Sequence, residues 1–253
     1  QTDYRNSVWN CGILPVYRQQ LYSVYGEYKS TAREFFATVN LTHNREWYNR
    51  IYEQRIENGQ VQRVSLPLSN HGSGYTVKST LSKGFYDLGL KTSLMALLNI
   101  SKAEQISGGQ RLPYQYRLMR LEPKVIWTPN RHWETSYQTD IRYGGSKIGE
   151  RTRLAPLWNV IQQVQLSYIF SPIEASLSVD HYHNDVNEDQ SVNAVFADFS
   201  VSWKSGRWQI TATATNLFDK RTYAYTRYAS LESYTSWVRI RPREFLVAIR
   251  YRL

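Results

Sequence analysis

The chain has 253 residues, a formal net charge of +10 at pH 7 and a mean hydropathy of −0.54. Its longest apolar run, near Leu94–Leu98, is far shorter than the roughly 20 apolar residues that a membrane-spanning helix needs. The sequence therefore excludes helical spans and allows one large β domain or two ordinary ones. Membrane-spanning β-strands stay open, because only every second side chain of such a strand meets lipid.

The positive charge is scattered, with weak clusters in the expected loops. Because the sequence has no basic helix, no zinc-finger spacing and no aromatic RNA-stacking motif, we expect no nucleic-acid partner. Anionic lipid headgroups or lipopolysaccharide phosphates fit the charge as well, although solvated loops are the simplest explanation. The one cysteine, Cys11, allows no intrachain disulfide. No signal peptide is recognisable at the start, so an export signal would have been removed or would lie upstream.

Polar and apolar side chains alternate with a period of two from about residue 20 to the end of the chain, which predicts β-strands rather than helices. About eleven strands are expected. In chain order they are Leu21–Tyr28, Glu34–Asn44, Tyr75–Phe85, Leu90–Ser101, Tyr116–Trp127, Trp133–Tyr143, Val160–Phe170, Glu174–Tyr182, Val192–Trp203, Trp208–Asn216 and Val238–Leu253.

Short and long connections alternate between these strands. This asymmetry is typical of outer-membrane barrels, which have short periplasmic turns and long extracellular loops. The five short turns are Lys29–Arg33, Tyr86–Gly89, Thr128–His132, Ser171–Ile173 and Lys204–Arg207, and all but the first carry Pro, Gly or Asn. The long connections are Arg45–Gly74, Lys102–Gln115, Gly144–Asn159, His183–Ser191 and Leu217–Trp237.

One face of each predicted strand is apolar and the other carries charged or hydroxyl side chains, as a soluble β-sandwich would also show. The 20 Tyr and 8 Trp favour a membrane barrel, because their apolar bodies and polar tips suit a water–lipid boundary. We therefore predict a single all-β domain, residues 1–253, that forms a transmembrane antiparallel up-and-down β-barrel. The aromatics beside short turns, expected to form an interface girdle, are Trp127, Trp133, Phe170, Trp203 and Trp208.

The last strand is amphipathic to the end of the chain. Its other face carries Arg250 and Arg252. We expect this strand to descend to the periplasmic rim and to present its apolar residues to the barrel-insertion machinery. These residues, the predicted C-terminal assembly signal, are Phe245, Val247, Ile249, Tyr251 and Leu253.

A motif precedes the last hairpin: Asn216, Leu217, Phe218, Asp219 and Lys220 stand in sequence, followed by Tyr223. It resembles the Asn-Leu-Phe-Asp-Lys-x-Tyr motif near the C-terminus of TonB-dependent outer-membrane receptors, and the Tyr- and Asn-rich loops are similar to the Bacteroidota-type branch. The resemblance implies a location in the outer membrane of a Gram-negative bacterium, amid lipid and lipopolysaccharide. It also implies uptake of a scarce, bulky nutrient such as an iron chelate, a glycan or a peptide.

The chain departs from that family in length. Its members resemble 22-stranded barrels with an internal plug, whereas about eleven strands and no plug are found here. We therefore expect the C-terminal half of a barrel, with the N-terminal half and plug missing and TonB acting through that missing part. The alternative is a self-contained small barrel acting as a pore, an adhesin or an enzyme, but eleven is odd and single-chain bacterial barrels have even strand numbers.

The one dense His/Asp cluster contains His181, His183 and Asp185. Two histidines at this spacing are able to hold a metal, and an outward His/Asp pair is known in small-barrel proteases. The strand parity places all three on the lipid side, whereas catalytic groups should line the lumen with Asp180 and Tyr182. We therefore expect no enzyme, no metal and no cofactor, and we expect the inward charges of mixed sign to be wetted or paired.

Overall fold

A computed structural model describes residues 6–10, 12, 14–57, 60–149, 152–186, 189–228 and 233–252. No helix among them is long and apolar enough to cross a membrane. A single 3-10 turn, η1 (Tyr86–Leu88), is described beside the strands. The strands are β1 (Asn6–Trp9), β2 (Tyr17–Ser30), β3 (Phe35–Tyr48), β4 (Ile51–Glu57), β5 (Gln60–Leu66), β6 (Asn70–Phe85), β7 (Leu90–Ser107), β8 (Gln110–Asn130), β9 (Trp133–Ile148), β10 (Thr152–Phe170), β11 (Ile173–Asp185), β12 (Ser191–Ser205), β13 (Trp208–Thr215), β14 (Thr222–Tyr228), β15 (Ser233–Arg239) and β16 (Glu244–Tyr251).

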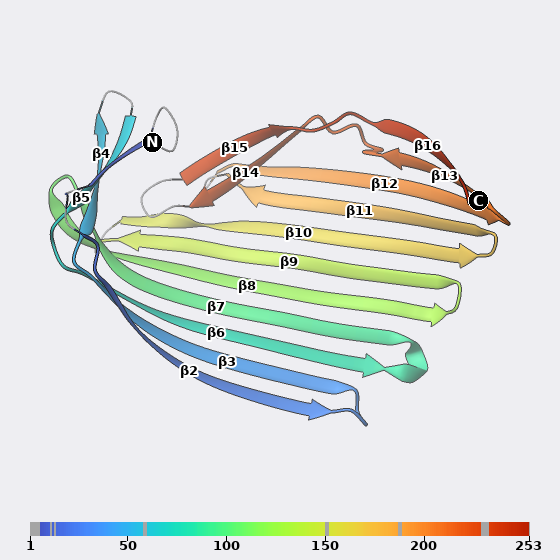
Figure 1. The fold of residues 1–253 in the computed structure, drawn as a ribbon, viewed down its shortest axis with the longest axis horizontal. Helices are drawn as coiled ribbons and strands as arrows, with labels where there is room; N and C mark the ends of the chain where they lie inside the picture. Colours follow the sequence, from blue (N-terminus) through green and yellow to red (C-terminus); the bar gives the residue numbers. More distant parts are fainter. Residues whose placement is uncertain are drawn as a thin grey trace.

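Eleven of these strands form one antiparallel up-and-down sheet in the order β2, β3, β6 to β13, β16. Figure 1 shows them side by side in a single curved layer, with the tight turns at one end. The β4–β5 hairpin rises at the other end, where β1 pairs with β5 in parallel and β4 briefly pairs with β7 in parallel. The β14–β15 hairpin is separate from the sheet and contacts β11 and β12. The predicted all-β, up-and-down architecture is confirmed.

The sheet is open along two edges. Within the described residues, β2 pairs only with β3, and β16 pairs only with β13. Every described side chain of β16 is exposed, as are all but the last of β2. The backbone groups along the outer side of these two strands therefore lack partners within the described chain.

All eleven predicted strands are present, but the predicted long connections are too long. Arg45–Gly74 contains the end of β3, the β4–β5 hairpin and the start of β6. Three others are shorter than predicted, because residues at both of their ends extend the strands. Pairing continues through Lys102↔Gln115 up to Ser107↔Gln110, where Gly108 and Gly109 make the turn with positive φ. The polar residues of this segment break the apolar pattern. The ladder between β7 and β8 nevertheless satisfies the backbone groups that face the partner strand, whatever the side chains are.

The other two corrected connections lie farther along the chain. Gly144 and Gly145 lie inside β9 rather than in a loop, and a Cβ on Gly145 would stand 3.4 Å from the Pro156 Cβ. The register shifts between Leu154 and Leu157, which absorbs the local irregularity. The third, His183–Ser191, contains the end of β11 and the first residue of β12, with only residues 186–190 between them.

The predicted last strand, Val238–Leu253, is also wrong at its start. Its first two residues end β15, and β16 begins only at Glu244. Pro242 lies between the two strands, and proline has no backbone N–H to donate to a ladder. The predicted loop Leu217–Trp237 contains β14 and most of β15. Leu253 lies outside the described residues.

Side chains directly opposite one another in an antiparallel ladder share a face, so the registers sort the sheet into two surfaces. One row of partners runs Trp133, Tyr168, Ala175, Val201, Ala212, Val247 from β9 to β16. We call the surface that carries this row the apolar face and the opposite one the polar face. No second sheet packs against the apolar face within the described chain, so the β-sandwich alternative does not hold there.

Candidate membrane-facing surface and loop anchor

The apolar face is exposed across the sheet. Leu41 on β3 is 44% exposed, Leu98 on β7 is 42% exposed and Val247 on β16 is 66% exposed. The described buried apolar residues are few and lie mostly near the loop ends of the strands, as Ile51 and Ile106 do. An exposed apolar surface of this extent marks an interaction surface, since soluble monomers rarely show one.

One aromatic row borders the apolar face at the short-turn ends of the strands. The structure places all the predicted girdle residues in it, half-exposed and on one face. Neighbouring rings in this row contact each other: Trp133 and Tyr168 have centroids 4.6 Å apart, and Trp208 and Tyr251 are 4.7 Å apart. The members of this short-turn row are Phe85, Trp127, Trp133, Tyr168, Phe170, Trp203, Trp208 and Tyr251.

A second aromatic row borders the same face at the opposite ends of the strands. His43 stacks on Tyr75 with centroids 4.3 Å apart, and Tyr143 contacts Trp158 at 4.6 Å. Tyr22 on β2 lies opposite His43 and completes the row on that side. The prediction from the sequence missed this loop-side row. The available signal was the ten-residue spacing from Trp133 to Tyr143 on a single strand.

The distance between the two rows follows from that spacing. Ten residues separate Trp133 from Tyr143 on β9, Tyr168 from Trp158 on β10 and Phe85 from Tyr75 on β6. At roughly 3.3 Å per residue, the rows lie about 33 Å apart along the strands. Two aromatic rows therefore bracket an apolar band of constant length on three separate strands.

The strands are tilted relative to these rows. Val247 is in register with Trp133, yet the short-turn row on β16 lies at Tyr251, four residues farther on and five strands away. Four residues span about 13 Å and five strand spacings about 24 Å, which gives a tilt of about 30°. Corrected for that tilt, the apolar band is about 28 Å high, close to the hydrocarbon thickness of roughly 30 Å.

The polar face carries charges, and some of them pair with one another. The Arg120 guanidinium donates two hydrogen bonds to the Asp140 carboxylate, at 3.0 and 2.9 Å. Arg142 donates to the same carboxylate at 2.6 Å, and Lys204 reaches Glu174 at 2.6 Å across β11 and β12. These pairs neutralise part of the charge on this face.

The motif at the end of β13 folds into a tight turn around Asn216, which is 7% exposed and has a φ of 51°. The Asn216 side-chain amide donates to the carbonyl oxygens of Lys220, at 2.9 Å, and Arg241, at 2.8 Å. Its side-chain oxygen accepts from the Lys220 amide at 2.9 Å, and its own backbone N–H donates to Asp198 at 2.7 Å. One side chain therefore joins the turn to the segment that leads into β16.

Asp219 makes the second connection from this turn. It also has a left-handed φ of 51°, and one of its carboxylate oxygens accepts from the Arg243 amide at 2.9 Å. The other oxygen accepts from the Arg221 guanidinium at 2.9 Å. The hydrogen bond from Arg221, followed by the one from the Arg243 backbone, holds the pKa of the Asp219 carboxyl below its usual value.

The other motif residues have different surroundings. Phe218 is 57% exposed, and the Leu217 amide donates to the Ala197 carbonyl at 2.8 Å. Two residues rather than one separate Lys220 from Tyr223, which departs from the family pattern. The Tyr223 hydroxyl still accepts a 2.6 Å hydrogen bond from Asn184 on β11, and its ring contacts Tyr182 edge-on at 5.2 Å.

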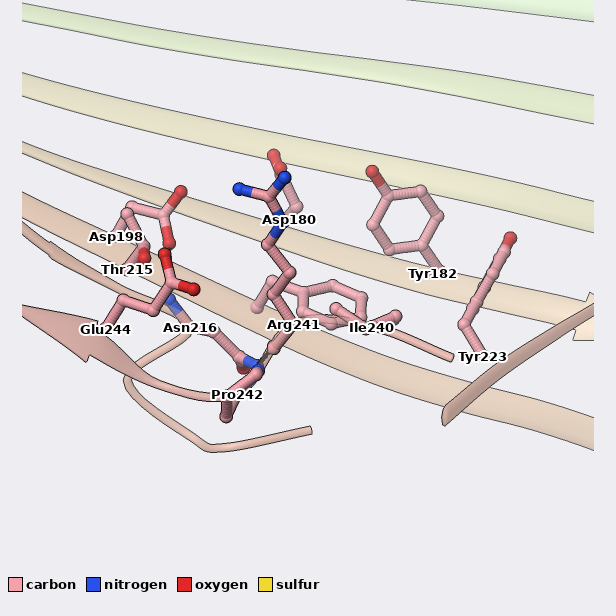
Figure 2. Close-up of a pocket in the computed structure, with 11 residues that line it drawn as sticks. Asp180, Tyr182, Asp198, Thr215, Asn216, Tyr223, Ile240, Arg241, Pro242 and Glu244 are labelled. Atoms are coloured by element: carbon pink, nitrogen blue, oxygen red, sulfur yellow. Dashed lines mark hydrogen bonds between the residues drawn. The ribbon is translucent and has the colours of Figure 1, made fainter. Parts of the chain in front are cut away.

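These contacts hold the last loop, the segment between β13 and β16 that includes the β14–β15 hairpin, over the polar face. An open cavity of about 550 Å³ lies between this loop and the sheet. Figure 2 shows Tyr182 and Tyr223 at one side of it and Asp198 and Glu244 at the other, with Arg241 between them. Carboxylates and phenols of this kind accept hydrogen bonds from hydroxyl or amine groups. The cavity combines side chains from β11, β12 and β16 with the loop, a grouping that the sequence alone did not reveal.

The structure places His181, His183 and Asp185 on the apolar face, in agreement with the strand parity. His183 contacts Asp185 at 3.2 Å, and His181 contacts the Gln162 side-chain oxygen at 3.0 Å. Asp185 also accepts a 2.8 Å hydrogen bond from the Trp158 amide. Asp185 therefore lies level with Trp158 in the loop-side row. His183 lies two residues and His181 four residues farther along β11 toward the short-turn row.

The described residues of the C-terminal assembly signal share the apolar face. Phe245 is 75% exposed, Ile249 is 65% exposed and Tyr251 is 45% exposed. Each lies opposite an apolar partner on β13: Ala214, Ile210 and Trp208, respectively. The strand presents this side chain series along an open edge of the sheet.

No protein-family model and no curated protein matches the sequence. Among solved structures, the chain is similar to the ferric yersiniabactin uptake receptor FyuA from Yersinia pestis, with 8% sequence identity and a TM-score of 0.43. The match covers 94% of this chain and 43% of the FyuA chain, so the chain spans less than half the length of that receptor.

Proposed function

We propose that this chain is one part of the wall of a transmembrane β-barrel in the outer membrane of a Gram-negative bacterium. The observation that carries the proposal is the exposed apolar band, about 28 Å high and bordered by two aromatic rows. Lipid solvates the apolar face, and Trp127, Trp133, Phe170, Trp203 and Trp208 lie at one interface. The polar face lines the lumen.

The directions of the two open edges restrict what closes this wall. Both β2 and β16 run from the loop end of the sheet toward the short-turn end, because the meander has eleven strands. Membrane sheets have no open edges, because unpaired backbone groups are too costly in lipid. An antiparallel closure therefore takes an odd number of additional strands. If a second copy of this sheet lay beside the first in the same orientation, its β2 would run parallel to β16 of the first copy. Such a pair of copies would therefore not close an antiparallel barrel.

We propose further that the barrel belongs to a TonB-dependent receptor. The support is the Asn216–Lys220 turn, its position before the last membrane strand and its resemblance to the family motif. The resemblance implies an N-terminal barrel half and a plug outside this chain, with TonB acting through them. The barrel takes up a scarce bulky nutrient, an iron chelate, a glycan or a peptide, and the Bacteroidota-type branch remains a prediction.

Nutrient uptake in cells tests this function. Cells that produce the full-length protein should accumulate one of a set of labelled iron chelates, oligosaccharides or peptides. Accumulation should stop when the protein or TonB is deleted, or when a protonophore collapses the membrane potential. Uptake that continues without TonB would contradict a TonB-dependent receptor and favour a passive pore.

A further inference from the structure

A group of cations lies on the apolar-face side just beyond the loop-side aromatic row. One register row runs Arg45, Ser73, Lys102, Gln115, Lys147 across β3, β6, β7, β8 and β9. Arg117 lies one step nearer the apolar band, opposite Ile100 and Gly145. Since opposing residues share a face, all four cations project from the same surface as the lipid-facing residues.

Three of these cations form a compact group around Gln115. Lys102 and Lys147 lie on the strands that flank β8, about 10 Å apart at the usual strand spacing, with Arg117 diagonally between them. We call Lys102, Arg117 and Lys147 the basic triad. Lys102 and Arg117 are exposed and Lys147 is half-buried.

No described carboxylate forms an ion pair with the basic triad. The two register rows at Arg45 and at His43 contain no acidic residue between β3 and β9. The nearest described acid on this face, Glu104, lies two residues beyond Lys102 and forms its ion pair with Arg111. The positive charge of the triad is therefore not neutralised by the part of the protein that the structure describes.

The two borders of the apolar band differ in the number of cations that the strands carry on the apolar face. At the short-turn border, Lys83 is the one described strand cation on the apolar face, and its ammonium donates to the Arg33 carbonyl. Lys204 also lies near the short-turn border, but it projects from the polar face and forms an ion pair with Glu174 there. On the strands, therefore, more apolar-face cations without a described ion pair lie at the loop-side border (Arg45, Lys102, Arg117 and Lys147) than at the short-turn border (Lys83).

We propose that the basic triad, assisted by Arg45, binds the phosphate groups of an anionic glycolipid in the outer leaflet of the membrane. This inference rests on the proposed function, because it needs the apolar face in lipid and the loop side outward. Arginine donates two parallel hydrogen bonds to a phosphate, and lysine supplies a point charge. The acyl chains of such a lipid lie on the apolar band below, beside Tyr143 and Ile100.

The test measures lipid binding by the purified full-length protein in mild detergent. The probes are phosphorylated lipid A, the same lipid with its phosphates removed, and inorganic phosphate. The variant combines Lys102→Gln, Arg117→Gln and Lys147→Gln. A matched control combines Lys78→Gln, Lys91→Gln and Lys124→Gln, three cations on the polar face of neighbouring strands.

The triad variant should bind phosphorylated lipid A about 100-fold more weakly than the unmodified protein, since each of the three cations contributes about fivefold near a lipid surface. The control variant should bind it within about twofold of the unmodified protein, because its cations face away from lipid. Removal of the lipid phosphates should weaken binding to the unmodified protein as much as the triad variant does.

Equal binding by the triad variant and the unmodified protein would overturn the assignment. So would tight binding of the dephosphorylated lipid, or displacement of lipid A by equimolar inorganic phosphate, which would indicate a site for the free anion. Cell fractionation separates this inference from the proposed function. If the unmodified protein is absent from the outer membrane, the proposed function fails and this inference fails with it.

Discussion

Asn216 is a single residue that holds the last loop against the sheet. Its side chain makes three hydrogen bonds, to Lys220 and Arg241, while its backbone has a left-handed conformation that asparagine tolerates better than most residues. The same residue begins the motif that was singled out from the sequence. Its role in the fold is therefore to fix where the loop leaves β13 and where the chain returns to β16.

Replacing this side chain tests that role. Asn216→Gly keeps the backbone conformation but loses the three side-chain hydrogen bonds, so protease cleavage of the β14–β15 loop should become about tenfold faster or more. Asn216→Ala should be worse still, because alanine also disfavours a positive φ. Limited proteolysis of the folded protein measures both. Unchanged cleavage of the glycine variant would show that these hydrogen bonds do not hold the loop.

Asp219 gives the same loop a pH dependence. Its pKa in the folded protein lies below the usual value of 3.8. A carboxyl with a lowered folded-state pKa stabilises the fold fully above the unfolded-state value and loses this effect as the pH falls through the folded-state value. Amide hydrogen exchange at Arg243, whose N–H bonds Asp219, should therefore quicken relative to the intrinsic rate once the pH falls below 3.8.

Asp219→Asn is the control for that measurement. It removes the titrating group, so protection at Arg243 should be lower at neutral pH and should not change further on acidification. If the unmodified protein and Asp219→Asn show the same pH profile, Asp219 is not the group responsible.

At the scale of one element, β16 shows which features of a strand are visible in the sequence. The alternation of Phe245, Val247 and Ile249 with polar-face residues predicts both the strand and its faces. The start of the strand was not predictable in the same way. Residues 233–239 have a similar alternation, but they pair with β14, and Pro242 separates the two strands.

The two faces of β16 should respond oppositely to an added charge. Val247→Arg places a guanidinium near the middle of the apolar band and should lower assembled protein strongly, since such a charge costs about 2–4 kcal/mol at the bilayer midplane. Leu246→Arg, one residue away on the polar face, should assemble normally. Heat-modifiability on gels measures the assembled fraction. Similar losses for both variants would contradict the assigned faces.

The end of the same strand carries the predicted assembly signal. Changing Tyr251 and Leu253 to Asp should abolish insertion into the outer membrane, because the insertion machinery is expected to recognise the apolar series of the last strand. The outer-membrane fraction of cells gives the readout. Normal assembly of this double variant would refute the role of these residues in insertion.

For the other elements, the sequence predicts pairing partners better than strand lengths. The tight turns are marked by residues within the turn itself, such as Gly89 with its positive φ, and the predicted positions of these turns were correct. The extensions of β7 and β8 beyond Ser101 and Tyr116 have no regular apolar face, so no periodicity marks them. Their pairing depends on long-range ladders, which a local pattern does not contain. The cavity under the last loop was hidden for the same reason.

At the scale of the whole molecule, the strand registers give the dimensions of the apolar face, which the pattern of residues along single strands does not. The loop-side aromatic row, the tilt and the height of the apolar band all come from which residues lie opposite each other across the strands. None of them comes from hydropathy alone, which is negative on average for this chain. Under the proposed function, lipid covers the large exposed apolar face of the sheet and further strands cover its two open edges.

The central claim is that lipid covers the apolar face, and paired spin labels on β7 test it most directly. In the full-length protein, with Cys11→Ser as background and reconstituted in a lipid bilayer, a nitroxide is attached at Leu94→Cys on the apolar face or at Met95→Cys on the polar face. The label at residue 94 should be accessible to oxygen and shielded from a water-soluble nickel chelate, and the label at residue 95 should show the reverse. Equal exposure of both labels to the nickel chelate would contradict the account.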